Sequence, residues 1–132
     1  MRRAGCALLT ALLGVSCGGN DVTAPTEETT SPVTVTWTTL LAPRGSASRT
    51  LTVSEGGTIS VTLQSAPVDV GLGVGVPQAN GSSCRATVST TASPGPTPQL
   101  SAPVEQGTYC VVVYDVVGVA DSFAFTAIVV HP

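Results

Sequence analysis

Cysteine is the residue type in this sequence with the most distinctive chemistry. Four cysteines occur among 132 residues, and Cys6 lies inside an apolar N-terminal stretch. Cys17 follows the small residues that end this stretch, whereas Cys84 and Cys110 lie far along the chain. A thiol can be acylated, oxidised to a disulfide or bound to a metal, and its surroundings decide which of these occurs.

Cys84 and Cys110 are best explained as a structural disulfide. Their bond would close a loop of about 26 residues, which in the chain-entropy model adds about 3.5 kcal/mol to the free energy of unfolding. The competing interpretation is a redox or metal-binding pair. No Cys-x-x-Cys spacing occurs, and no second pair or well-placed histidine completes a metal site. We therefore predict a disulfide and no bound metal or cofactor.

The sequence offers little for acid–base or nucleophilic catalysis. Its single histidine, His131, is the penultimate residue, and chain ends are usually mobile. Serines are plentiful but have no partner base. We therefore expect a protein without enzymatic activity.

Three carboxylates fall near predicted strand ends or turns, where they could bind calcium: Asp69, Asp115 and Asp121. Calcium takes six to eight oxygen ligands. Three scattered acids more often form solvated turns, so we keep them as calcium candidates only. Carbohydrate binding would need exposed aromatic platforms, but all large aromatic side chains except Tyr114 are expected in the core: Trp37, Tyr109, Phe123 and Phe125.

Charge excludes a class of partner. Beyond the N-terminal stretch, Arg44, Arg49 and Arg85 stand against eight acidic residues, a net charge of −5, and lysine is absent. Nucleic-acid binding needs clustered lysine and arginine to displace counterions. We therefore expect no nucleic-acid partner and no polybasic membrane patch.

The first 16 residues have the parts of a secretory signal. Arg2 and Arg3 form a short basic head, residues 4–15 form an apolar centre, and Ser16 ends it with a small side chain. The apolar centre is too short to span a bilayer as a mature helix. We therefore expect residues 1–16 to be removed on export.

The cysteine after Ser16 gives this junction a resemblance to the lipobox of bacterial lipoproteins. In that family the cysteine receives a diacylglycerol through a thioether, cleavage occurs before it, and its amino group is acylated with chains such as palmitate. Cys17 is the matching residue, while Gly14 stands where the family usually has an aliphatic side chain. The resemblance implies an anchor in the bacterial envelope, at the outer membrane or cell surface. The alternative is an ordinary signal peptide that leaves Cys17 as a free thiol.

A flexible polar tether is expected at residues 17–32. The stretch from Gly18 to Ser31 is acidic and almost free of large apolar side chains, so it cannot bury a core. It is suited to hold a domain off the membrane. Residues 33–132 are enough for one ordinary domain.

From residue 33 onward apolar and polar residues alternate with a period of two, which is typical of half-buried strands. No window beyond the leader has helical periodicity. Short strands separated by frequent turns predict an all-β fold, a small antiparallel β-sandwich of the jelly-roll or immunoglobulin-like kind. A small closed barrel is the alternative. The predicted strands lie near residues 33–38, 50–53, 58–63, 70–76, 109–114 and 123–129.

One predicted strand, residues 70–76, alternates aliphatic residues with glycine. One of its faces therefore has no side chains, and glycine in a strand interior costs stability. We favour close approach of another strand or loop as the reason. A ligand lying across the bare face is the alternative.

Three segments, in the same order along the chain, match the pattern of a known family. They are residues 51–65 with a glycine pair before a strand, residues 68–77 with an Asp-containing aliphatic strand, and residues 104–116 with a Gly-Thr-Tyr strand. The chain from Trp37 onward thereby resembles the pre-peptidase C-terminal domain, a β-sandwich of secreted bacterial proteins. The resemblance implies a non-catalytic accessory role, and some members of that family bind matrix proteins or calcium.

The same resemblance directs attention to Val112, which stands where that family has an outward-facing polar residue. Cys110 and Tyr114 have the same parity along the strand. An exposed apolar patch of Val112 and Tyr114 would be an interaction site beside the disulfide. The alternative, which we favour, is that the segment from Ser89 to Pro98 covers these side chains.

These observations converge on a non-catalytic, lipid-anchored envelope protein. Its β-sandwich would bind another envelope or extracellular macromolecule. The alternative is a secreted soluble module that binds calcium or polysaccharide through its strand-end loops.

Overall fold

Eight β-strands form the described part of the chain, which covers residues 31–79 and 83–132 of this computed structural model. The predicted leader, Cys17 and the tether up to residue 30 lie outside the described residues. No helix that could span a bilayer occurs within the described ranges. The strands are β1 (Val33–Leu41), β2 (Ser46–Val53), β3 (Gly57–Ser65), β4 (Val70–Pro77), β5 (Cys84–Ala92), β6 (Leu100–Val104), β7 (Gly107–Asp115) and β8 (Phe123–His131).

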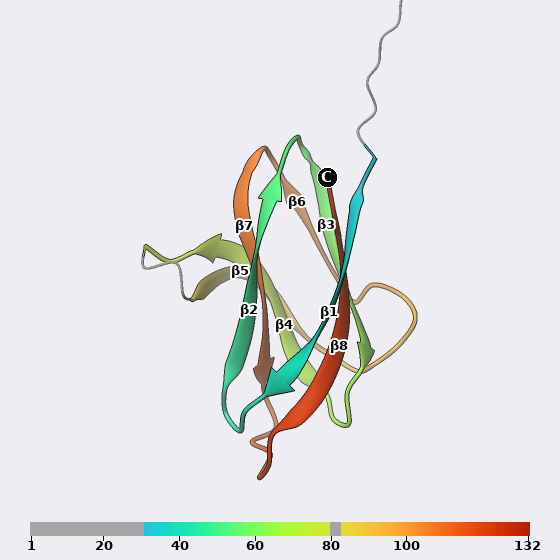
Figure 1. The fold of residues 1–132 in the computed structure, drawn as a ribbon, viewed down its shortest axis with the longest axis vertical. Helices are drawn as coiled ribbons and strands as arrows, with labels where there is room; N and C mark the ends of the chain where they lie inside the picture. Colours follow the sequence, from blue (N-terminus) through green and yellow to red (C-terminus); the bar gives the residue numbers. More distant parts are fainter. Residues whose placement is uncertain (1–30, 80–82) are drawn as a thin grey trace, which may run out of the picture. The chain divides into compact units, whose positions relative to one another are not determined.

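The strands form two antiparallel four-stranded sheets (Figure 1). Sheet A has the order β1-β8-β3-β6, and sheet B has the order β2-β7-β4-β5. The first and last strands pair along their whole length, from Val33 opposite His131 to Leu41 opposite Phe123. Eight antiparallel strands in two packed sheets with these non-local pairings form a jelly-roll β-sandwich, which confirms the predicted fold class.

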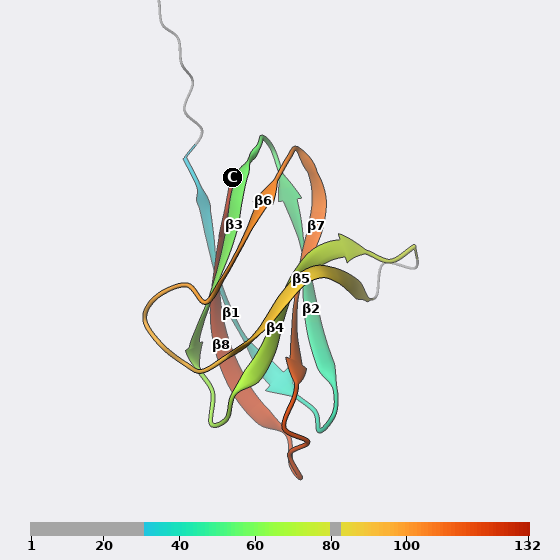
Figure 2. The same ribbon diagram turned by 180° about the vertical axis from the view of Figure 1, so that it is seen from behind.

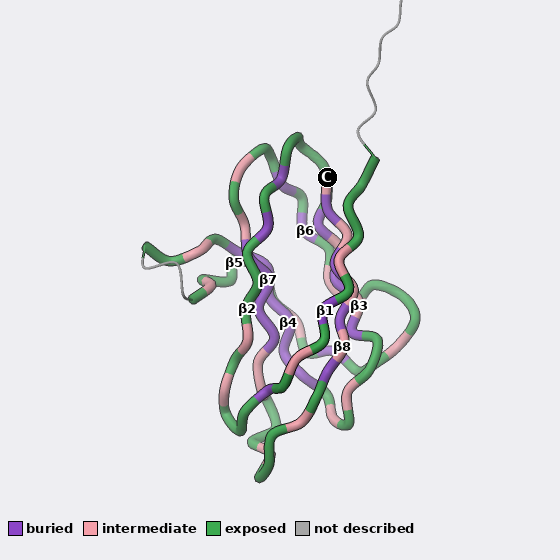
Figure 3. Tube along the Cα trace, viewed as in Figure 1, coloured by how far each residue is buried: buried purple, intermediate pink, exposed green. Residues whose placement is uncertain are grey.

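The period-two pattern of the sequence builds the core between the sheets. In β3 and β8, the alternate aliphatic and aromatic residues are buried, while the residues between them face outward. Trp37 and Phe125 meet edge to face with ring centroids 5.1 Å apart. Tyr109 and Phe123, also expected in the core, are partly buried against it. Figure 3 shows the buried residues along the strands and exposed residues at the ends of the sandwich.

Two strands, β5 and β6, were not predicted from the sequence. Residues 89–92, the first part of the segment from Ser89 to Pro98, belong to β5. The rest of the connection to β6 lies against β3. Gly95 N donates a hydrogen bond to Leu63 O at 2.9 Å, and Leu63 N donates one to Gln99 Oε1 at 2.7 Å. The Gln99 side chain thus takes the place of a neighbouring strand there.

Candidate functional site

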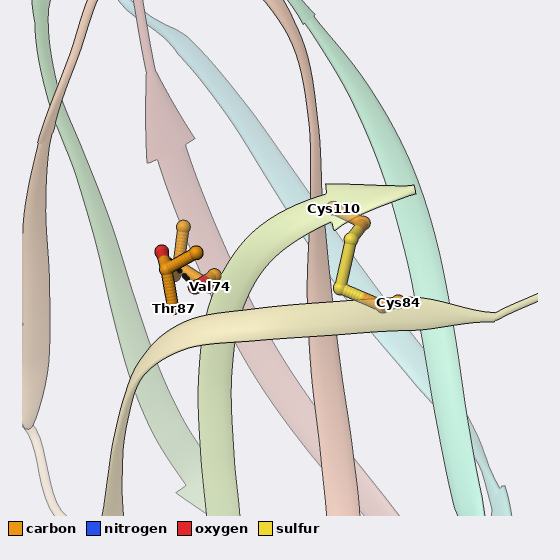
Figure 4. Close-up of a disulfide and its surroundings, with 4 residues drawn as sticks. All are labelled: Val74, Cys84, Thr87 and Cys110. Atoms are coloured by element: carbon orange, nitrogen blue, oxygen red, sulfur yellow. Dashed lines mark hydrogen bonds between the residues drawn. A yellow bond between two sulfur atoms is a disulfide. The ribbon is translucent and has the colours of Figure 1, made fainter. Parts of the chain in front are cut away.

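The predicted disulfide joins Cys84 in β5 to Cys110 in β7, with the two Cα atoms 5.8 Å apart (Figure 4). Strand β4 lies between β5 and β7 in sheet B, so the bond passes over an intervening strand. Cys110 pairs in register with Gly75 of β4, which has no side chain in the way. The disulfide therefore fixes the start of β5 to the middle of β7.

A β-bulge brings the start of β5 into this position. Val74 pairs with Val88 and Gly75 pairs with Ala86, which leaves Thr87 as an extra residue. The Thr87 hydroxyl donates to the Val74 carbonyl at 3.2 Å (Figure 4). Because a bulge increases local twist and bends the strand, the β4–β5 hairpin turns sideways out of the sandwich (Figures 1 and 2).

The bare glycine face of β4 is filled by neighbouring segments. A Cβ on Gly71 would meet the Tyr114 ring, and a Cβ on Gly75 would meet the Arg85 carbonyl. A Cβ on Gly73 would lie 2.8 Å from the Ala86 Cβ and 2.9 Å from Val112 Cγ1. Close approach of neighbouring groups is therefore the reason for the three glycines. No room remains over them for the ligand that was the alternative.

The proposed exposed patch of Val112 and Tyr114 needs a correction. Val112 is only 8% exposed, and Tyr114 is half-buried against Gly71. The favoured explanation, that the segment from Ser89 to Pro98 covers these side chains, was also wrong. The loop that follows β5 in this segment bonds to β3 in the other sheet. The bulge instead turns the start of β5 towards Val112.

Asp115 organises one end of the sandwich. Its Oδ1 accepts hydrogen bonds from the amides of Val117 and Gly118, both at 2.9 Å. Its Oδ2 accepts from the amides of Arg44 at 2.8 Å and Val119 at 3.0 Å. These amides, the Arg44 amide above all, lower the pKa of Asp115 from 3.8 to about 2, against a smaller opposing effect of desolvation. The carboxylate thereby ties the β1–β2 turn to the β7–β8 loop.

The three calcium candidates do not gather into one site. Asp115 directs its oxygens at backbone amides, and Asp69 accepts a hydrogen bond from the Ser93 hydroxyl at 2.8 Å. Asp121 is exposed in the β7–β8 loop. Among residues 31–79 and 83–132, no three histidine, cysteine or acidic residues are grouped so that they could hold a metal ion.

The β7–β8 loop presents apolar side chains to solvent. We call residues 116–122 the distal loop, because it lies at the end of the sandwich opposite to the first residue of β1 (Figure 1). Val116 is 42% and Val117 is 58% exposed, although both follow directly on the ordered Asp115. Sequence reasoning missed this feature. The signal was an Asp three residues before a glycine, since Asp in a turn bonds to the amides that follow it.

His131 was expected at a mobile chain end but is ordered. It is the last residue of β8, pairs in register with Val33 and is 6% exposed. Its Nδ1 lies 2.9 Å from the Pro132 carbonyl oxygen. Strand pairing therefore holds the end of the chain in place.

Two open hollows lie elsewhere on the domain. One, of about 370 Å³, adjoins edge strand β2, and its lining includes Ser46, Ser48 and Val112. The other, of about 500 Å³, lies at the β6–β7 turn beside Tyr109, whose phenol oxygen accepts from the Glu105 amide at 3.1 Å. The lining of the first hollow has no ionisable side chain, and that of the second has only Glu105 and Tyr109. Neither hollow therefore brings together an acid and a base.

Comparison with known proteins supports the fold alone. The part of the chain that is described belongs to the small jelly-roll β-sandwiches. Among solved structures, the Yersinia pseudotuberculosis-derived mitogen is similar, with a TM-score of 0.54 at 12% identity, over 77% of this chain and 88% of that chain. No family model and no curated protein sequence matches the chain. The resemblance to the pre-peptidase C-terminal domain therefore stays a prediction.

Proposed function

We propose that this chain is a non-catalytic, lipid-anchored protein of the bacterial cell envelope. Its β-sandwich would bind another envelope or extracellular macromolecule through the distal loop. The lipobox-like junction at Cys17 supports the anchor. The Cys84–Cys110 disulfide supports export, because disulfides persist in oxidising compartments.

The observation that carries the binding proposal is the Asp115 carboxylate with its four amide donors. A loop ordered in this way loses little conformational entropy when a partner binds, which favours affinity. Val116 and Val117 are the large apolar side chains that it exposes. A partner surface with a small apolar pocket would match them.

The position of the anchor favours the same end of the sandwich. The tether would enter at Val33, at the end opposite to the distal loop. The distal loop would then be the part of the domain farthest from the attachment point.

The anchor is tested by changing Cys17 to Ala and fractionating the cells. The wild-type protein is expected in the membrane fraction and to incorporate labelled palmitate. The variant is expected to lose the label and to leave the membrane fraction. A variant that stays with the membrane would contradict the anchor and favour the soluble alternative.

Binding is tested by photocrosslinking on intact native cells. A photoreactive residue at position 117 should capture one dominant partner. The same residue at Thr52, an exposed position on β2, serves as the control. Capture should be lost when Val116 is changed to Ser. Capture of the same proteins from both positions, or of none from position 117, would contradict the proposed binding end.

A further inference from the structure

The outward face of sheet A carries no charged side chain. None of its four strands contains Asp, Glu, Lys or Arg. The face consists of hydroxyl, small aliphatic and amide side chains from alternate positions. We call it the threonine face, and its members are Thr34, Thr36, Thr38, Leu40, Thr58, Ser60, Thr62, Gln64, Ser65, Ser101, Pro103, Ala124, Thr126, Ile128 and Val130.

These side chains lie in rows across the strands. Thr36 of β1 pairs with Ile128 of β8, and Ile128 pairs with Thr62 of β3. No member of the face is buried, and Leu40 is 67% exposed. Nothing in the described ranges of the chain therefore covers this face.

Sheet B differs from sheet A because it carries charged side chains and because part of its outward face is covered. Its strands carry Arg49, Arg85 and Asp115. The centre of its outward face is filled by the start of β5 and by the disulfide. Only sheet A therefore leaves a large uncharged surface without a cover.

We propose that the threonine face is the contact surface between two copies of this chain, packed sheet against sheet. In a symmetric dimer, the same surface must complement itself. A hydroxyl both donates and accepts hydrogen bonds, so a hydroxyl-rich face meets this requirement, whereas a charged face would repel its copy. Thr38 and Thr126 already form such a pair within one sheet, with their hydroxyl oxygens 3.0 Å apart.

The dimensions of the face suit a dimer. Four strands about 4.8 Å apart, each up to nine residues long at about 3.3 Å per residue, give a face of roughly 500 Å². Two copies would bury about 1,000 Å² together, which reaches the lower limit for a specific interface. Two stacked sheets also accommodate each other's twist by crossing at about 30°.

Charge and stiffness favour a second copy as the occupant. The acidic residues of the described ranges lie at the two ends of the sandwich, with Glu55 and Glu105 at one end and Asp69, Asp115 and Asp121 at the other. They stay clear of a face-to-face contact. Threonine, valine and isoleucine have stiff χ1 angles, so ordering them at an interface costs little entropy.

The test measures the mass of the lipid-free chain in solution. The chain from residue 17 onward, carrying Cys17→Ser and an intact disulfide, is examined by sedimentation equilibrium. Concentrations run from about 1 µM to about 500 µM, because an interface at the lower limit of size is expected to be weak. The wild type is expected to approach twice the monomer mass at the highest concentrations.

A charge placed on the threonine face should abolish the dimer. Thr36→Glu places two carboxylates in the contact and is expected to raise the dissociation constant about 100-fold. Because Thr36 is exposed, the fold should persist, as an unchanged melting temperature would demonstrate. Leu40→Gln, a second variant on the face, should weaken the dimer without adding charge.

The matched control is Thr52→Glu, on the outward face of sheet B. Thr52 is also exposed and also lies on an edge strand. Its dissociation constant should stay within about threefold of the wild type. A wild type that is monomeric at the highest concentration would overturn the proposal. So would a folded Thr36→Glu variant that dimerises like the wild type, or a control that loses the dimer equally.

Discussion

At the scale of single residues, Asp115 makes stability depend on pH. Its pKa of about 2 in the fold lies below the ordinary 3.8, so the fold favours the ionised form. This contribution is fully present above about pH 4 and is lost as the pH falls through about 2. Asp115→Asn should lower the melting temperature at neutral pH. It should also flatten the curve of melting temperature against pH between about pH 4 and pH 2.

The control for Asp115 lies in the distal loop that follows it. Asp121 is exposed, and Asp121→Asn should leave the melting temperature at neutral pH close to that of the wild type. Thermal melts at a series of pH values would decide the matter. An Asp115→Asn profile parallel to the wild-type profile would exclude this role for the carboxylate.

The glycines of β4 allow a second residue-scale prediction. Gly75→Ala would place a Cβ on the Arg85 carbonyl, which is backbone and cannot move aside easily. We expect a loss of about 1–3 kcal/mol in the free energy of unfolding, the usual cost of overpacking. Gly95→Ala is the control, because its Cβ would have no neighbour nearer than Gln99 Nε2 at 3.6 Å. Urea denaturation with equal losses at both positions would contradict the close-approach explanation.

Residue chemistry could be predicted only where it did not depend on the three-dimensional arrangement. A cysteine spacing that completes no metal site was enough to predict the Cys84–Cys110 disulfide. The burial of Val112 could not be foreseen, because it depends on the bulge at Thr87, where one extra residue redirects the start of β5. The part played by Asp115 was missed because two of the segments that it joins, at Arg44 and at Val119, are far apart in sequence.

At the scale of elements, the disulfide holds the bent β4–β5 hairpin against β7. Its removal by Cys84→Ser together with Cys110→Ser should lower the free energy of unfolding by about 3.5 kcal/mol, for the 26-residue separation that it closes. Denaturant titration of the wild type under oxidising and reducing conditions gives the matching comparison. Equal stability after confirmed loss of the bond would mean that the bulge alone maintains the bend.

Element prediction succeeded where strands bury a regular row of side chains. In β1, β3, β4 and β8 the large apolar residues recur at about every second position, and β7 is an apolar run that is buried on both faces at its centre. β5 was missed because it is an edge strand whose residues are mostly exposed, which removes the alternation. β6 has only five residues and contains Pro103, so it resembled a loop.

At the scale of the whole molecule, non-local pairing should set the folding rate. Sheet A cannot form until β8 is inserted between β1 and β3, and β1 and β8 lie at opposite ends of the domain sequence. Loop-closure entropy must be overcome before these contacts form, so all-β domains of this kind fold in milliseconds to seconds. Refolding of the oxidised chain, followed by Trp37 fluorescence, should fall in that range. Refolding complete within about 100 µs would contradict this view.

The pairing of Val33 with His131 also makes the domain suitable for insertion into another protein. Opposed residues in antiparallel strands have Cα atoms only about 5 Å apart, so the chain enters and leaves the domain at neighbouring points. A domain with adjacent ends can be inserted into a surface loop of a host protein without forcing the host's loop apart. Residues 31–132 could therefore serve as a removable insert that keeps its own core and its own disulfide.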